Sequence, residues 1–329
     1  MRRRDFLGVL GCGVATIGLP CANAQQPGKV YRVGYLSGGT AASRVPLVAS
    51  LKQGLRDLGY IEGTSLFFEA RYAEGKFENL PALAQELLGY NLDVLLASTT
   101  PGALAAKNAT SSVPIVIVGV ADPIGSGLVQ SLARPGGNIT GTSNIGAELA
   151  GKRLQILAEL IPSASRIAVM VNTDDPNWRA QMDSASEAAK NLGIKLDPVV
   201  PVRSPAELTS AVETAAAAKV DGAIRMIDPL VAGLAARTVK LAHEHRLPIV
   251  HPFREAVAAG GLISYGTNQP AYYQQTAMFV HRILNGARPA DLPLELPTKF
   301  ELAINLKAAK ELALSVPTSI LLRADEVIE

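Results

Sequence analysis

The chain has 329 residues, and its 31 lysines and arginines against 29 aspartates and glutamates give a formal net charge of +2. That length suffices for two domains of ordinary size. The near-balance of charge leaves no basic stripe of the kind that binds nucleic acid, so we expect no nucleic-acid partner. No stretch after residue 24 approaches the length of an apolar membrane span.

The first 24 residues predict an export signal. A basic start at Arg2-Arg3-Arg4, an uncharged run over residues 8–19 and the small residues Ala22-Asn23-Ala24 follow in the order of such signals. Arg3-Arg4 followed by Phe6-Leu7 fits the twin-arginine type, with general secretory export as the open alternative. The mature protein would start near Gln25 and be periplasmic.

Both cysteines, Cys12 and Cys21, precede this cleavage point. A mature chain without cysteine suits an oxidising compartment and excludes disulfides, thiolate metal sites and cysteine nucleophiles. Lipid anchoring through Cys21 is the alternative, although residues 18–20 match a lipoprotein signal poorly.

From residue 30 onward, short β-branched runs alternate with longer amphipathic stretches. Strands are expected at residues 31–36, 66–72, 93–97 and 115–119. Helices are expected at residues 45–58, 79–88, 102–108 and 125–133. This alternation predicts βαβ units and a parallel sheet with both faces covered.

A stretch rich in Gly, Asn, Thr and Ser, residues 135–144, precedes a restart of the same pattern. Strands are then expected at residues 166–171, 196–202, 222–227, 249–251 and 262–265, and helices at residues 148–160, 177–192, 206–218 and 230–245. The tail predicts a helix at 271–284, a strand at 300–304, a helix at 307–314 and a strand at 319–322. The fold class is therefore α/β, with two units in series that each hold a parallel sheet.

Polar residues follow the predicted strands at their carboxyl ends, where ligands of open parallel sheets bind. Hydroxyls, glycines and a few carboxylates in this place suit a small polar or zwitterionic ligand. The candidate ligand-binding residues are Ser37, Gly38, Thr40, Thr99, Thr100, Asp122, Asn172, Asn177, Asp228, Tyr265 and Gly266. Each of them alone also fits a helix cap or a turn.

We assign roles to some of these candidates. Asp122 and Asp228 are candidates for binding an ammonium group. Ser37, Gly38, Thr99 and Thr100 are candidates for binding a carboxylate, since helix N-termini offer amides and a positive dipole end.

Signatures of catalysis are weak in this sequence. The glycines near residue 38 do not form G-x-G-x-x-G, and no G-x-x-x-x-G-K-[ST] loop occurs. His243 and His245, two apart on a predicted helix, would not face the same way to bind a metal. We therefore expect no catalytic residue, no metal and no cofactor.

The chain resembles the type I periplasmic substrate-binding proteins of ABC transporters, in the branch that includes tryptophan- and aromatic-amino-acid-binding members. The resemblance covers nearly all of the mature chain. The motifs that carry it lie, in order, at residues 33–39, 54–60, 133–141, 151–154, 259–266 and 297–302.

The resemblance implies two Rossmann-like lobes joined by three crossing segments, with the ligand closed between them. It implies an N-terminal lobe of residues 25–143 plus about 268–290 and a C-terminal lobe of residues 144–267 plus about 291–329. The small residues of the first crossing suit a hinge; they are Thr140, Gly141, Thr142, Ser143 and Asn144.

The function implied is capture of a small polar or amino-acid-like solute by hinge closure, for delivery to a membrane permease. Such a protein would be a monomer and no enzyme. Two alternatives stay open: a ligand-sensing domain for a signalling partner, or an α/β enzyme without a recognisable catalytic motif.

Overall fold

The computed structural model describes residues 29–144 and 146–329. The predicted export signal over residues 1–24, with Cys12 and Cys21, lies outside this part. Among the described residues, no helix has both the length and the apolarity needed to cross a membrane.

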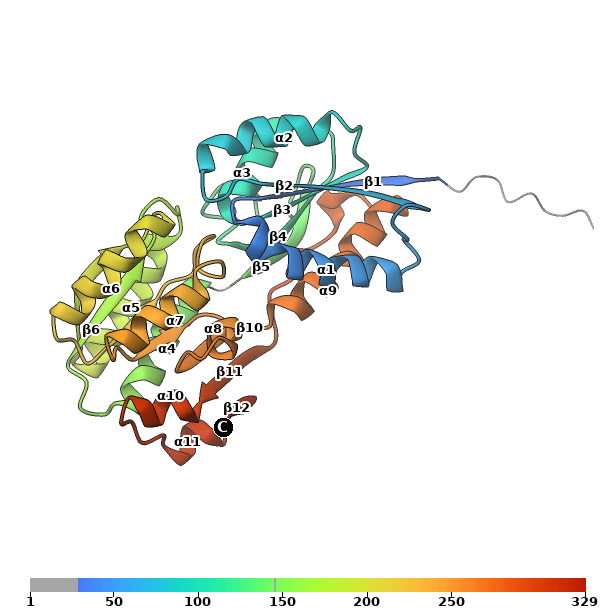
Figure 1. Ribbon diagram of the computed structural model, residues 1–329. Coiled ribbons are helices and arrows are strands. Elements are labelled where there is room, and N and C mark those ends of the chain that lie inside the picture. Colours follow the sequence, from blue (N-terminus) through green and yellow to red (C-terminus); the bar gives the residue numbers. More distant parts are fainter. Residues whose placement is uncertain (1–28, 145) are drawn as a thin grey trace, which may run out of the picture.

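The described chain forms two α/β lobes (Figure 1). The first lobe holds a five-stranded parallel sheet in the order β2-β1-β3-β4-β5. Its elements are β1 (Tyr31–Ser37), α1 (Ala41–Asp57), β2 (Leu66–Tyr72), η1 (Phe77–Asn79), α2 (Leu80–Leu88), β3 (Val94–Ser98), α3 (Thr100–Ala109), β4 (Ile115–Ala121), β5 (Ile139–Asn144), α9 (Gln269–Leu284) and η3 (Pro289–Asp291).

Successive side chains of a strand point to opposite faces of the sheet, and the strands of this sheet carry apolar side chains on both faces. Helices therefore cover both faces. Val33 and Tyr35 of β1 belong to the core formed with α1 and α9, whereas Leu36 belongs to the core formed with α2 and α3. Helix α9 comes from the C-terminal part of the chain and packs along α1, so the first lobe is completed by a distant segment (Figure 1).

The second lobe holds a seven-stranded sheet in the order β12-β11-β10-β9-β8-β6-β7. Its strands are parallel except for β10 and β11, which pair antiparallel. Its elements are α4 (Gly146–Leu160), β6 (Arg166–Val171), α5 (Trp178–Leu192), β7 (Lys195–Pro201), η2 (Pro205–Glu207), α6 (Leu208–Ala217), β8 (Gly222–Arg225), α7 (Ala235–Glu244), β9 (Ile249–His251), α8 (Arg254–Ala258), β10 (Ile263–Thr267), β11 (Phe300–Asn305), α10 (Leu306–Glu311), α11 (Thr318–Leu321) and β12 (Glu326–Ile328).

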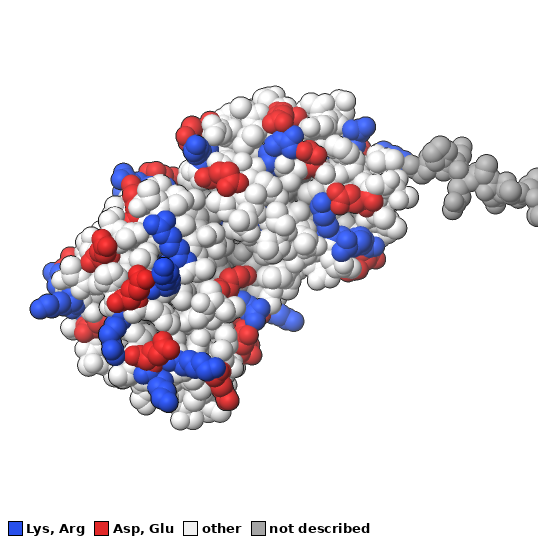
Figure 2. Space-filling model, viewed as in Figure 1, with Lys and Arg blue, Asp and Glu red and all other residues white. Residues whose placement is uncertain are grey.

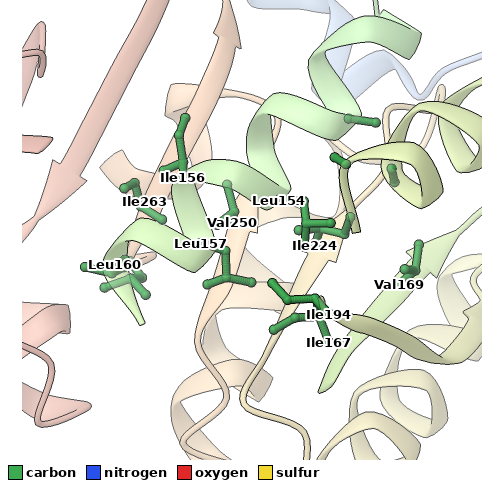
Figure 3. Packing of buried hydrophobic residues seen from close by; sticks show 14 of the residues in the cluster. Leu154, Ile156, Leu157, Leu160, Ile167, Val169, Ile194, Ile224, Val250 and Ile263 are labelled. Atoms are coloured by element: carbon green, nitrogen blue, oxygen red, sulfur yellow. The ribbon is translucent and has the colours of Figure 1, made fainter. Parts of the chain in front are cut away.

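The core of the second lobe lies between α4 and the sheet. Leu154 and Leu157 of α4 point toward Ile167, Ile224 and Val250 of the central strands, and all five are fully buried (Figure 3). Burial of each such side chain contributes about 1.5–3 kcal/mol to folding.

The chain passes between the lobes three times: from β5 to α4, from β10 to α9, and from η3 to β11. On the third passage Leu294 donates its backbone N–H to Leu132, and Glu295 donates to Gly141. Residues 292–295 therefore run beside β5 of the first lobe before the chain enters the second sheet.

Two predicted elements are wrong. Residues 125–133 form turns instead of a helix, because the Asp122 side chain accepts from the Gly125 N–H and Gly127 has a φ of 71°. Residues 319–322 do not form a strand; α11 occupies Thr318–Leu321, and the strand that pairs with β11 is β12.

Candidate ligand-binding site

A cavity of about 70 Å³ lies between the two lobes. Figure 2 shows the surface hollowed where the lobes meet, with acidic and basic side chains interspersed over the rest of this face. The residues that line the cavity are Arg44, Thr99, Thr100, Val118, Gly119, Ala121, Asn144, Gly146, Leu149, Asp175, Asn177, Gln181, Ile227, Asp228, Pro229, Phe253, Thr267, Gln269, Tyr272 and Tyr273.

Strand ends of both sheets supply much of this lining. Thr99 follows β3, Ala121 ends β4, Asp228 lies after β8 and Phe253 follows β9. Because the carboxyl ends of parallel strands share one edge, the two sheets turn their loop edges toward each other across the cavity. The predicted location of the site is therefore where the cavity lies.

Thr99 shapes the first-lobe wall at the N-terminus of α3. Its Oγ1 accepts from the backbone N–H groups of Gly38 and Gly102, both at 3.3 Å. Its φ of 70° places a β-branched residue in the left-handed region, which costs on the order of 1–3 kcal/mol. Strain of this kind concentrates at ligand-binding loops.

Two side chains hydrogen-bond directly across the cavity. Asn177 Nδ2 of the second lobe donates to Thr100 Oγ1 of the first at 2.8 Å. Arg44 Nη2 of α1 donates to the Pro229 carbonyl of the second lobe at 3.4 Å. These contacts hold the lobes against each other.

Arg44 carries a positive charge into the cavity. The residue is 6% exposed, and its Nε has no hydrogen-bond partner among the residues that the structure describes. A buried guanidinium cannot shed its proton at ordinary pH, so the unused N–H is an open site for an acceptor.

Asp175 contributes an acidic group from the second lobe. Its Oδ1 accepts from the Asn177 backbone N–H at 2.8 Å and from Asn177 Nδ2 at 2.9 Å. Burial, together with the nearby Asp228 carboxylate, raises the pKa of Asp175 to about 6, although the bonds from Asn177 oppose the rise. The group therefore changes charge close to neutral pH.

Asp228 forms a buried ion pair with Arg225. Its Oδ2 lies 2.6 Å from Arg225 Nη2, and both side chains are 1% exposed. Its Oδ1 accepts from the Leu230 N–H at 2.7 Å. Burial, reinforced by the charge of Arg225, lowers the pKa of the neighbouring His251 to about 3, so that imidazole stays neutral.

Tyrosines of α9 form the side of the cavity next to the first sheet. The Tyr273 hydroxyl lies 3.0 Å from that of Tyr35, which in turn lies 2.8 Å from Ser98 Oγ. The Tyr272 hydroxyl donates to the Ser143 carbonyl at 2.5 Å. The returning helix is thus tied by hydrogen bonds to β1 and β5, and through Tyr35 to β3.

The structure brings four of the predicted ligand-binding residues to the cavity lining: Thr99, Thr100, Asn177 and Asp228. The other seven lie outside the lining. Ser37 Oγ accepts from the Gly39 N–H, Thr40 caps α1, Asp122 is exposed and caps a turn, and Asn172 accepts from the Asp174 N–H.

The other three predicted residues outside the cavity lining make contacts within the fold. They are Gly38, Tyr265 and Gly266. The Gly38 N–H donates to Thr99 Oγ1, and the Tyr265 ring lies 6.3 Å from that of Phe300. A Cβ at Gly266 would collide with the Pro252 carbonyl, so this position needs glycine for close backbone approach.

The predicted hinge residues form strand β5 rather than a loop. Thr140, Gly141, Thr142 and Ser143 are buried, and Asn144 at the end of β5 lines the cavity. Hydroxyl groups on this edge strand bond to neighbouring carbonyls, as Ser143 Oγ does to Val120 at 2.9 Å, so a composition typical of loops is stable in a sheet.

Several lining residues were missed by sequence reasoning, notably Arg44, Asp175, Gln181, Phe253, Tyr272 and Tyr273. For Asp175 and Phe253 a signal existed, because both stand in the loops after predicted strands. Arg44 precedes the predicted start of its helix at residue 45, and its burial depends on the opposing lobe.

Two α/β lobes that enclose a cavity with polar and apolar walls between the loop edges of their sheets define a binding protein for small molecules. The family model of the ABC transporter substrate binding proteins matches residues 41–328. The chain belongs to this family of substrate-binding components of ABC transporters, whose members work outside the cytoplasmic membrane.

Relatives agree with this assignment. A tyrosine-binding protein of Clostridioides difficile is 28% identical over 277 residues, which are 83% of this chain and 79% of that protein. The crystal structure of an ABC domain from Streptococcus pneumoniae in complex with L-Trp has a TM-score of 0.84 at 26% identity, covering 91% of this chain and 100% of that one.

A ligand-free, open structure of a substrate-binding protein with adhesive properties from Clostridium difficile matches less closely. Its TM-score is 0.65, also at 26% identity, and covers 91% of this chain and 99% of that one. The predicted resemblance and the two-lobed α/β fold are confirmed. The named relatives are binding proteins rather than enzymes.

Proposed function

We propose that this protein captures a small amino-acid-like ligand between its lobes, releases it unaltered to the permease of an ABC transporter, and works as a monomer in the periplasm. The observation that carries the proposal is the cavity itself. It joins a buried guanidinium of one lobe, Arg44, to buried carboxylates of the other, Asp175 and Asp228. Opposite charges on facing walls complement a zwitterion.

The arrangement of the lobes supports closure around the ligand. At equal identity and chain coverage, the structure agrees better with the L-Trp complex than with the open, ligand-free relative. The hydrogen bonds from Asn177 to Thr100 and from Arg44 to Pro229 can form only when the lobes meet. A ligand that contacts both lobes therefore stabilises the closed state by its differential contacts.

In this proposal the candidate residues of the two lobes bind different groups of the ligand. Thr99 and Thr100 at the start of α3 present backbone and hydroxyl groups to an acceptor on the ligand. Asp175 faces an ammonium group, and Asp228, whose oxygens are engaged by Arg225 and the Leu230 N–H, adds negative charge to the same wall. Ser37 and Gly38 act behind this wall by fixing the backbone around Thr99.

The lobes of the proposal are residues 25–143 with the α9 segment, and residues 144–267 with the C-terminal segment. The three passages between them form the hinge, with Asn144 at the end of β5 on the first passage. Export through the residue 1–24 signal, of twin-arginine type, would bring the protein to the periplasm.

Titration calorimetry of the exported protein, unfolded and refolded to strip bound ligand, tests the proposal against the twenty L-amino acids. We expect one-to-one binding of at least one of them, and mass spectrometry of the recovered ligand should show it unchanged. Binding of none, or a chemically altered ligand, would refute the proposal.

A further inference from the structure

We propose that Arg44 reads a carboxylate on the ligand and couples that contact to closure of the lobes. The inference rests on the proposed function and narrows it, because a ligand without an anionic group at this point would not hold the closed state. Arg44 is not among the ligand-binding residues predicted from the sequence.

The first step is the unused donor. Arg44 is 6% exposed in the closed arrangement, and its Nε–H meets no acceptor among the described residues. A buried charged donor without a partner is costly. Because Arg44 lines the cavity, a ligand in the cavity can supply the missing acceptor.

The second step is that no carboxylate within residues 29–144 and 146–329 forms an ion pair with Arg44. Asp228 of the second lobe acts on Arg44 electrostatically, but its two oxygens are engaged by Arg225 and by the Leu230 N–H. Glu255 of α8 also faces Arg44, without a hydrogen bond between them. On the first-lobe side, burial raises the pKa of the Tyr35 and Tyr72 hydroxyls, so both stay neutral. The Tyr273 hydroxyl also faces Arg44.

The third step is the geometry of the guanidinium. Its Nη2 already donates to the Pro229 carbonyl of the opposite lobe at 3.4 Å. That carbonyl is held in place because the Asp228 side chain before it is fixed by Arg225 and Leu230. A planar fork can bind two acceptors at once, so Nε can hold a carboxylate while Nη2 holds the lobe.

Gly39 provides the space for this arrangement. A Cβ at Gly39 would lie 2.6 Å from Arg44 Nε and 3.1 Å from the Pro229 oxygen. The missing side chain therefore lets Arg44 and Pro229 approach each other. A methyl group at this position would push the guanidinium away from both acceptors without changing any charge.

The test compares three forms of two ligands: L-tryptophan and L-tyrosine, their carboxamides, and their decarboxylated amines, with myo-inositol as an uncharged probe. In wild type we expect an acid to bind about 100-fold more tightly than its amide or amine, as for a buried charged hydrogen bond. Small-angle X-ray scattering should show the radius of gyration falling with the acid alone.

Four variants separate recognition from folding. Arg44→Gln should bind the acid about 100-fold more weakly and bind the amide as wild type does. Arg44→Lys should restore part of the affinity, because an ammonium keeps the charge but not the fork. Gly39→Ala should also weaken acid binding. Arg56→Gln, which removes an exposed charge from the same helix, should change nothing.

The ligand-free unfolding temperature of Arg44→Gln should stay close to that of wild type, because the hydrogen bond from Arg44 to Pro229 joins the two lobes and not two parts of one lobe. The inference would be overturned if wild type bound the acid and its amide equally tightly, or if Arg44→Gln bound the acid as tightly as wild type does. A preference for myo-inositol would overturn it too. In each of these cases the proposed function as a binding protein would still stand. If wild type binds no probe and none of the twenty amino acids, the proposed function falls as well.

Discussion

Asn177, the residue before α5 in the second lobe, donates its side-chain amide to the hydroxyl of Thr100, the first residue of α3 in the first lobe, at 2.8 Å. The bond joins the N-terminus of a helix in the first lobe to the N-terminus of a helix in the second lobe. It is therefore available only in the closed arrangement.

Removing this bond should weaken ligand binding without weakening the fold. Asn177→Ala and Thr100→Val each lose a hydrogen bond worth about 0.5–1.5 kcal/mol, so affinity for the ligand should fall about 2- to 10-fold. Calorimetric titration of both single variants and the double variant gives the coupling energy. Asn108→Ala, at an exposed position of α3, is the control, and fully additive losses at 177 and 100 would contradict a cross-cleft bond.

Asp175 should make stability depend on pH. The pKa of Asp175 is about 6 in the folded protein. An aspartate in an unfolded chain has a pKa of about 3.9. Between these two pH values the folded chain therefore holds more protons than the unfolded chain. The stabilisation is complete below about pH 4 and is lost as the pH rises through about 6, by roughly 2–3 kcal/mol.

Asp175→Asn should remove that part of the pH profile, because the neutral amide keeps an oxygen for the Asn177 donors. Urea unfolding of both proteins from pH 4 to pH 8 measures the difference. If the difference in unfolding free energy between Asp175→Asn and wild type stayed constant from pH 4 to pH 8, Asp175 would be ionised over the whole range and the prediction would be wrong.

The Arg225–Asp228 pair should be costly to break on one side. Asp228→Ala leaves a buried guanidinium without its carboxylate, and the expected loss is about 3–5 kcal/mol in unfolding free energy. The double variant Arg225→Met/Asp228→Leu should regain much of this, since no charge is then buried.

An exposed pair with the same spacing serves as the control. Arg288 Nε and Asp291 Oδ2 lie 2.7 Å apart, with side chains 78% and 58% exposed. Asp291→Ala should cost less than about 1 kcal/mol. Equal losses at positions 228 and 291 would show that burial of the Arg225 pair does not determine its energy.

Gly141 should not tolerate a side chain. Its φ is 129°, and a Cβ there would collide with the backbone of Ile117 on the neighbouring strand β4. Gly141→Ala should lower stability by more than about 2 kcal/mol, measured by urea unfolding. Gly127→Ala, also at positive φ but with open space around it, isolates the strain term and should cost about 1 kcal/mol.

Sequence periodicity predicted the two sheets because their strands are short apolar runs between amphipathic helices. It failed at residues 125–133, where the capping carboxylate of Asp122 and the glycines at 125 and 127 turn the chain before a helix forms. It also missed β5, since hydroxyl-rich residues 140–143 bury their side chains by bonding to neighbouring carbonyls, as Ser143 does.

The site was predictable only where it depends on strand ends. Thr99, Thr100, Asn177 and Asp228 follow strands and line the cavity. Arg44 and Tyr273 lie within helices, at positions where periodicity says nothing of a ligand. They reach the cavity because a second lobe and a helix more than 200 residues away along the chain pack there, as the bond between Tyr35 and Tyr273, 238 positions apart, shows.

The central claim, that the lobes close on a small carboxylate-bearing solute, is tested most directly by small-angle X-ray scattering of ligand-stripped protein during titration with the twenty L-amino acids. The account predicts that at least one of them lowers the radius of gyration with one-to-one saturation. An unchanged radius with every one of them would contradict it.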